Sequence, residues 1–270
     1  MLIDTHCHLD ASEFDADRDV VIQAAIAQGV QMMVIPAVEK NNFAQVMELA
    51  EKHPQCAYAL GIHPMYVKNA QPEDLKTLNT ILERQIQSNL PPVAIGEIGL
   101  DYFVEDHDKA LQTFYFTEQL KLAKQFDLPV ILHVRRAIDD ILKYLRLHKV
   151  RGGIAHAFNG SQQQAEQFIE LRFKLGFGGA MTYPRALKIR ELATSLPIEA
   201  IVLETDAPDI PPEWLKKGEK NSPDHLKKIA EILAELREIK LAQVSEITTK
   251  NALEILPNIA KLFTPDKVLL

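Results

Sequence analysis

Short apolar segments alternate with helical segments along the whole sequence, and this alternation limits the folds that the chain can adopt. The apolar segments lie at residues 2–3, 31–36, 57–61, 93–97, 128–133, 153–156, 173–178 and 201–204. Segments with helical periodicity lie at 15–28, 42–53, 72–90, 108–126, 137–147, 162–171, 185–195, 223–239 and 241–255. Apolar runs without strict alternation are typical of strands buried on both faces of a parallel sheet. Their order predicts right-handed βαβ units.

Eight such units in a chain of 270 residues favour a closed (β/α)8 TIM barrel of the α/β class. A doubly wound open sheet is the alternative. Hydrophobic residues make up 47% of the chain, which is enough to form one large core. Because no Gly- or Ser-rich linker interrupts the pattern, we expect a single domain over residues 1–270.

Side chains with metal-binding chemistry gather at the predicted carboxyl ends of the strands, where the active site of a parallel barrel lies. These side chains are His6, His8, His63, Glu97, His133, His156 and Asp206. Five of the nine histidines therefore fall at one edge of the predicted barrel. Each buried imidazole needs a polar partner, and a shared metal ion would supply one to several of them. The pattern indicates a metal site.

The first strand end carries two of these histidines in the segment Asp4-Thr5-His6-Cys7-His8. Since side chains alternate along a strand, His6 and His8 face one way and Cys7 faces the other. Cys7 is therefore expected to be a buried core residue, although a thiolate is also a metal ligand by type. With only Cys7 and Cys56 and no visible export signal, we expect reduced thiols and a cytoplasmic protein.

Five motifs resemble, in the same order along the chain, those of the TatD family of metal-dependent hydrolases in the amidohydrolase-like superfamily, and in particular its YjjV-type bacterial members. The motifs are Asp4-Thr5-His6-Cys7-His8, Gly61-Ile62-His63-Pro64, Gly96-Glu97-Ile98-Gly99-Leu100-Asp101, His156-Ala157-Phe158-Asn159-Gly160-Ser161 and Glu204-Thr205-Asp206-Ala207-Pro208. One position departs from the family pattern, because Met65 stands where many members have a second histidine. That departure concerns a substrate contact rather than the metal site.

The resemblance implies a TIM barrel with two divalent metal ions. In this arrangement His6, His8 and Asp206 bind one ion, and His133 and His156 bind the other. The side chain of residue 97, a glutamate, bridges both ions, where many relatives in the wider superfamily use a carbamylated lysine. The resemblance also implies hydrolysis of phosphodiester bonds, with exonuclease-like cleavage of DNA as the expected activity.

The chemistry of such a centre follows from its charge. Two divalent ions roughly 3.5–4 Å apart share a water molecule and lower its pKa toward neutrality, so a metal-bridging hydroxide is the expected nucleophile. The positive charge of the two ions exceeds the combined negative charge of Glu97, Asp206 and this hydroxide. The pocket is therefore positive, which suits an anionic phosphodiester. Imidazole and carboxylate ligands suit Zn²⁺, Mn²⁺ or Fe²⁺, whereas Mg²⁺ is a less natural partner of several histidines.

Two carboxylates have expected roles in catalysis besides that of Glu97. Asp206 is either a metal ligand only or also the general base that accepts the proton of the attacking water. Glu204 precedes it by two residues, so both side chains face the same way on a strand. We expect Glu204 to support a metal-bound histidine or water, and the alternative is a solvent-facing carboxylate.

Substrate contacts are expected from side chains next to the ligands. Arg135 follows His133 by two residues and is a candidate phosphate clamp, because a guanidinium can bind two oxygens at once. Arg136 is its competitor. His63 either contacts substrate or is bonded to backbone, and Asp101 is expected to orient a loop or a ligand.

Charge and hydropathy restrict the partners. The net charge of −7 argues against a large basic surface for duplex nucleic acid, but it leaves DNA ends, single strands and small phosphodiesters open. The sequence has no run of about 18 apolar residues that would indicate a membrane span, and it has no feature that indicates an obligate protein partner.

Two other functions would use the same residues: a metal-dependent amidohydrolase or lactonase acting on a small molecule, and a non-catalytic barrel stabilised by metal.

Overall fold

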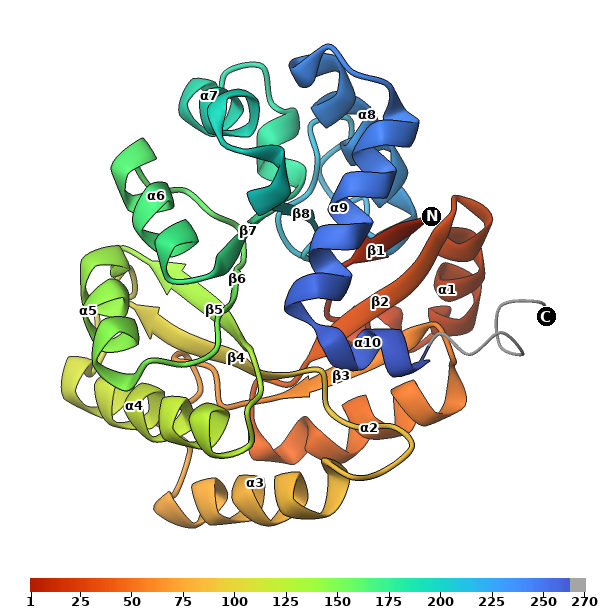
Figure 1. Cartoon of the computed structure of the whole chain (residues 1–270). Coiled ribbons are helices and arrows are strands. Elements are labelled where there is room, and N and C mark those ends of the chain that lie inside the picture. The colour runs from red at the N-terminus through yellow and green to blue at the C-terminus, as the bar shows by residue number, and fades with distance from the viewer. Residues whose placement is uncertain (263–270) are drawn as a thin grey trace.

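The computed structural model describes residues 1–262, which form a nearly closed barrel of eight parallel strands (Figure 1). The strands are β1 (Leu2–Asp4), β2 (Val30–Pro36), β3 (Cys56–Leu60), β4 (Ala94–Asp101), β5 (Val130–Arg135), β6 (Gly153–Ala155), β7 (Phe173–Phe177) and β8 (Ile201–Leu203). They pair in sequence order from β1 to β8. The predicted TIM barrel is confirmed, and this order excludes the doubly wound alternative. The last eight residues of the predicted domain lie outside the described residues.

Helices surround the strands, most of them as an outer ring and the last two across one end of the barrel (Figure 1). They are α1 (Arg18–Ala27), α2 (Phe43–Lys52), α3 (Pro72–Gln85), α4 (Lys109–Gln125), α5 (Ile138–His148), α6 (Gln162–Glu170), α7 (Leu187–Ser195), α8 (Leu226–Arg237), α9 (Leu241–Ile255) and α10 (Pro257–Leu262). Short 3-10 helices lie at Ser12–Phe14, Lys40–Asn42, Gly179–Thr182, Ile198–Ala200 and Pro223–His225. Among the described residues, no helix has both the length and the apolar character needed to cross a bilayer.

Hydrogen bonds just beyond the strand ends close the barrel between β8 and β1. The Thr5 N–H donates to the carbonyl of Leu203 over 3.0 Å, and the Asp206 N–H donates to the carbonyl of His6 over 2.9 Å. These bonds join the segments that follow both strands, although β8 and β1 themselves are not paired as a ladder. They place His6 and Asp206, which are far apart in sequence, side by side.

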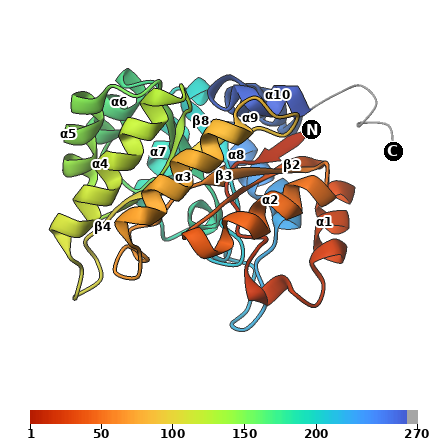
Figure 2. The same ribbon diagram turned by 90° about the horizontal axis from the view of Figure 1, so that it is seen from below.

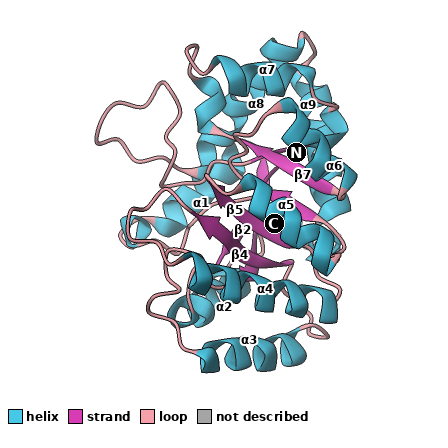
Figure 3. Ribbon diagram, turned by 90° about the vertical axis from the view of Figure 1, so that its left-hand side faces the viewer, coloured by secondary structure: helices cyan, strands magenta, loops and turns pink. Residues whose placement is uncertain are grey.

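The opposite end of the barrel, where the strands begin, is covered by α9 and α10. The Asn251 side chain of α9 donates to the carbonyl of Ile201 at the start of β8. The Asn258 side chain of α10 donates to the carbonyl of Pro92 just before β4. Figure 2 shows α10 on one side of the barrel and long loops on the other, and Figure 3 shows such loops in pink protruding from one side. The carboxyl ends of the strands are therefore the end available for a site.

Strand β4 is longer than the sequence predicts. The predicted strand ends at Glu97, whereas β4 continues to Asp101. Gly99 and Asp101 pair with His133 and Arg135 of β5, after a register irregularity between residues 95 and 98. Glu97 and His133 consequently lie within neighbouring strands rather than at their ends, which was not expected.

Two buried glutamines of α4 fix the chain near the site. The Gln119 side chain accepts from the Ile62 N–H over 2.7 Å and donates to the Ile62 carbonyl over 3.0 Å. Gln112 does the same with Asp101, over 2.9 and 3.0 Å. Since both ends of each amide are satisfied by backbone, α4 anchors Asp101 and the residue before His63.

Candidate metal centre

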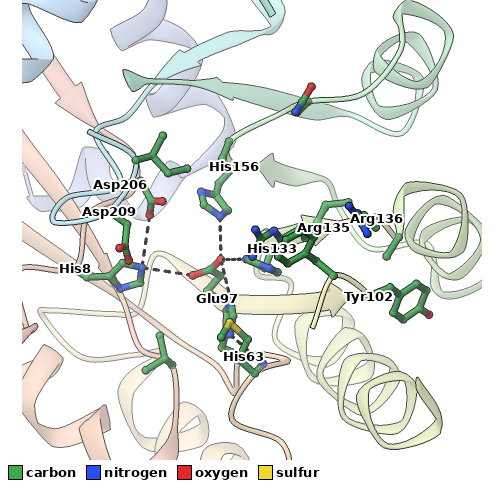
Figure 4. Close-up of a pocket in the computed structure, with 18 of the residues that line it drawn as sticks. His8, His63, Glu97, Tyr102, His133, Arg135, Arg136, His156, Asp206 and Asp209 are labelled. Carbon is green, nitrogen blue, oxygen red and sulfur yellow. Dashed lines mark hydrogen bonds and ion pairs between the residues drawn. The ribbon is translucent and has the colours of Figure 1, made fainter. Parts of the chain in front are cut away.

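The carboxylate of Glu97 lies at the centre of the candidate site, and its two oxygens face different side chains (Figure 4). Oε2 is 3.2 Å from Nε2 of His6 and 3.6 Å from Nε2 of His8. Oε1 is 3.0 Å from Nδ1 of His133 and 3.0 Å from Nε2 of His156. Glu97 is buried, with 2% of its surface exposed. A carboxylate in this position is suited to contact two cations at once.

The pair of histidines after β1 is arranged as strand alternation predicts. The Nε2 atoms of His6 and His8 are 3.2 Å apart. Cys7 between them is fully buried, and its thiol points toward the carbonyl of Val34 in the hydrophobic core. A cation beside the two Nε2 atoms would use both of their lone pairs.

Asp206 approaches the same two histidines from the other end of the chain. Its Oδ1 is 3.5 Å from Nε2 of His6 and 3.7 Å from Nε2 of His8. The backbone of Asp206 has φ of +53°, a left-handed conformation that is uncommon outside glycine. The Asn221 side chain holds the chain on both sides of Asp206, because it donates to the carbonyl of Thr205 over 2.9 Å and to that of Asp209 over 2.7 Å.

His63 lies beside the Glu97 carboxylate at the centre of the site, rather than at the edge of the cavity. Its Nε2 is 3.5 Å from Oε1 of Glu97, and its ring lies 4.3 Å from that of His133 between centroids. Its Nδ1 accepts from the Met65 N–H over 3.2 Å. The sequence left open a substrate contact or a bond to backbone; the backbone bond is present, and the contact with Glu97 was not assigned. Its position after β3, among the other strand-end histidines, was the available signal.

Two further carboxylates support the histidines that face Oε1 of Glu97. Oδ2 of Asp101 is 3.0 Å from Nε2 of His133, which agrees with the expected orienting role. Oε1 of Glu204 is 3.6 Å from Nδ1 of His156 and accepts from the Ala157 N–H. Glu204 is 1% exposed, so the solvent-facing alternative is wrong. Carboxylates behind metal-binding histidines fix the ring orientation and raise ligand basicity.

Burial and neighbouring charges shift the pKa values of the central groups. Burial alone would raise the pKa of Glu97, but His156, His63 and His6 outweigh it and hold that pKa well below its ordinary value. Burial lowers the pKa of His6 to about 3. The anionic form of Glu97 and the neutral form of His6 are those that bind metal. Burial alone would lower the pKa values of His133 and His156, but Asp101 raises that of His133 and Glu97 raises that of His156. Burial also raises the pKa of Asp206 to about 7, against the opposing effect of His156.

The central side chains line a cavity of about 1360 Å³ at the carboxyl ends of the strands. Three basic side chains line its β4–β5 side, Lys109, Arg135 and Arg136, together with the acidic Asp139 and Asp140 of α5. Acidic side chains line its β8–β1 side: Asp10, Glu13 and Asp209. Figure 4 shows Arg135 and Arg136 beside His133, and Asp206 and Asp209 across the cavity from them. Arg135 and Arg136 both reach the cavity, so the structure leaves both as candidate substrate contacts.

Three groups of side chains have donor atoms close enough to hold a metal ion. Within each group, the donor atoms all lie within 4.8 Å of one another: His6, His8 and Glu97; His6, His156 and Asp206; and His63, Glu97 and His133. Imidazole nitrogens and carboxylate oxygens suit divalent transition metals, so the residues fit a metal centre. The second group differs from the expected division, because His156 lies with His6 and Asp206, stacked on the His6 ring at 4.0 Å.

Comparison with known proteins identifies the family of the chain. The model of the family described as TatD related DNase matches residues 3–257. The chain belongs to the TatD family. Among its TatD relatives, YjjV of Escherichia coli K12, described as an uncharacterized metal-dependent hydrolase, is 42% identical over 250 residues, which cover 92% of this chain and 95% of YjjV. YabD of Bacillus subtilis 168, described in the same words, is 35% identical over 254 residues, which cover 93% of this chain and 97% of YabD.

The fold of the family is also shared. The crystal structure of E. coli YjjV, a TatD homologue, matches the barrel with a TM-score of 0.90 at 40% identity, over 95% of this chain and 98% of that chain. The predicted resemblance to the TatD family and its YjjV-type members is therefore confirmed. The protein is a member of a family of metal-dependent hydrolases.

Proposed function

We propose that the protein is a two-metal hydrolase that cleaves phosphodiester bonds, with a DNA end, a single strand or a small phosphodiester as substrate. The observation that carries this proposal is the position of Glu97, whose two oxygens face two separate sets of imidazole nitrogens. The description of the matching family as TatD related DNase supports a nucleic acid substrate. Zn²⁺ and Mn²⁺ suit the ligands better than Mg²⁺ does.

Six side chains would hold the ions in the proposed arrangement. His6, His8 and Asp206 would bind one ion, His133 and His156 the other, and Glu97 both. Bound there, two divalent ions would supply an activated water and a positive charge that exceeds the negative charge of the two carboxylates. His63 lies near enough to Glu97 to serve as a further ligand or to contact a bound phosphate.

The chain supplies the remaining steps through its own side chains. Asp206 is buried beside the histidines and borders the cavity, so its carboxylate is placed to accept a proton from an attacking water. Arg135 lines the same cavity and is placed to donate to a substrate phosphate. Both roles require the substrate to lie between the metal ligands and the β4–β5 side.

Glu204 is a positioning residue in this proposal, acting through His156. The substitution Glu204→Gln keeps the shape but removes the charge that faces Nδ1 of His156. We expect metal affinity or kcat/KM to fall about 10- to 100-fold, with part of the loss recovered at high metal concentration. Measuring kcat/KM against metal concentration checks this, with the exposed Glu191→Gln as control. Unchanged kcat/KM at limiting metal would show that Glu204 has no such role.

Hydrolysis assays test the function itself. Wild-type protein with Zn²⁺, Mn²⁺ or Mg²⁺ is expected to cleave bis(p-nitrophenyl) phosphate and a labelled single-stranded oligonucleotide. His6→Ala is expected to lose this activity, and His148→Ala, on α5, to keep it. No cleavage with any metal would reject the proposal. Hydrolysis of cyclic amides or lactones without phosphodiester cleavage would instead favour the amidohydrolase alternative.

A further inference from the structure

Two arginines and one phenylalanine form a cluster on the β4–β5 side of the cavity, outside the proposed metal ligands. The guanidinium carbon of Arg135 is 3.6 Å from the centre of the Phe103 ring, and that of Arg136 is 4.5 Å from it. Phe103 is 44% exposed although it is a large apolar residue, and all three side chains line the cavity. We call these three residues the Phe103 cluster.

The backbone after β5 brings both arginines to the same ring. Consecutive side chains of a strand point to opposite faces, so Arg135 and Arg136 would diverge if β5 continued. The strand instead ends at Arg135, and Arg136 adopts a left-handed conformation with φ of +55°. Such a conformation outside glycine is strained and is concentrated at functional sites.

The positive charges and N–H donors of the two guanidinium groups in the Phe103 cluster are available to bind a ligand. Within residues 1–262, neither arginine side chain has a hydrogen-bond acceptor or an ion-pair partner, whereas the neighbouring Lys109 is paired with Asp140 at 2.7 Å. An arginine stacked on a ring uses its face and leaves its N–H edge free for an oxyanion. Because the ring already orders both groups, binding an anion there loses less side-chain entropy.

We propose that the Phe103 cluster binds a second phosphate of the substrate, next to the phosphodiester at the metal centre. This inference rests on the proposed function and adds a preference for substrates with two neighbouring phosphates, as in a nucleotide chain. Arg135 lies two residues beyond His133 on β5, roughly 6–7 Å along the strand and on the same side. Asp139 and Asp140 also line the β4–β5 side, but Asp140 is paired with Lys109 and Asp139 accepts from the Gln164 side chain. Asp10, Glu13 and Asp209 across the cavity repel a phosphate there, so the second phosphate is directed to the two arginines.

Titration of the metal-loaded protein tests the subsite. Wild type is expected to bind thymidine 3′,5′-bisphosphate about tenfold or more tightly than either thymidine monophosphate, since hydrogen bonds to charged groups have this strength. The double variant Arg135→Gln/Arg136→Asn is expected to lose this preference. Both side chains are exposed, and asparagine tolerates the left-handed backbone, so the fold should persist.

The control Arg146→Gln/Arg151→Gln removes the same charge from exposed sites and is expected to keep the preference. Equal affinity of wild type for bisphosphate and monophosphates, or a preference that survives in the Arg135/Arg136 variant, would overturn the subsite. A wild type that fails to hydrolyse bis(p-nitrophenyl) phosphate would reject the proposed function alone, because the titration does not depend on hydrolysis.

Discussion

Replacing Glu97 by alanine is expected to remove both metal ions and to lower kcat/KM for a phosphodiester by at least about 10³-fold. The reason is geometric: its Oε2 faces His6 and its Oε1 faces His133 at 3.2 and 3.0 Å, so this one carboxylate contacts both expected ligand sets. Elemental analysis of protein purified without chelator gives the ion count, and initial rates give kcat/KM.

Two further variants make the Glu97 result specific. Glu97→Gln keeps the packing but removes the charge, and it is expected to lose ions and activity nearly as completely. Glu83→Ala removes an exposed carboxylate of α3 and is expected to change neither. Retention of both ions by Glu97→Ala would show that Glu97 does not bridge them.

Gly99→Ala is expected to lower the free energy of unfolding by at least about 3 kcal/mol, because strain and overpacking add together. Gly99 has φ of +153°, and a Cβ built there would lie 1.9 Å from the carbonyl oxygen of His133. The neighbour is backbone of β5 and cannot rotate away. Any relaxation would therefore displace His133, so the activity of the folded variant should fall as well.

Gly29→Ala is the matched control for that effect. Gly29 also has a positive φ, +89°, but a Cβ there would meet nothing within 4 Å. The control should therefore lose only about 1 kcal/mol from the left-handed backbone. Urea unfolding of both variants measures the difference. A Gly99→Ala protein as stable as Gly29→Ala would show that β4 and β5 can separate at His133 without penalty.

The barrel was predictable because its strands are buried on both faces and its helices are not. Val30–Pro36 and Phe173–Phe177 are almost continuously apolar, and the helical segments between strands show helical spacing. The end of β4 was not predictable in this way. Gly96 and Gly99 interrupt the apolar run, so the sequence predicts a strand that ends at Glu97. The pairing of β4 with β5 continues beyond that point only after a register irregularity, which the sequence does not reveal.

The convergence of the strand-end residues followed from topology, since parallel strands in a barrel bring their carboxyl ends together. The distribution of His63 and His156 among candidate ligand groups did not follow, because it depends on how far each side chain reaches into the barrel. The Phe103 cluster was also missed in its full form. It depends on the left-handed turn at Arg136, which only the backbone reveals.

Anomalous diffraction from crystals grown with Zn²⁺ or Mn²⁺ would examine the proposed centre directly. Two peaks are expected per chain, about 3.5–4 Å apart, with one oxygen of Glu97 bound to each. His6, His8 and Asp206 should surround one peak, and His133 and His156 the other. A single peak, or two peaks with Glu97 bound to neither, would contradict the two-metal centre.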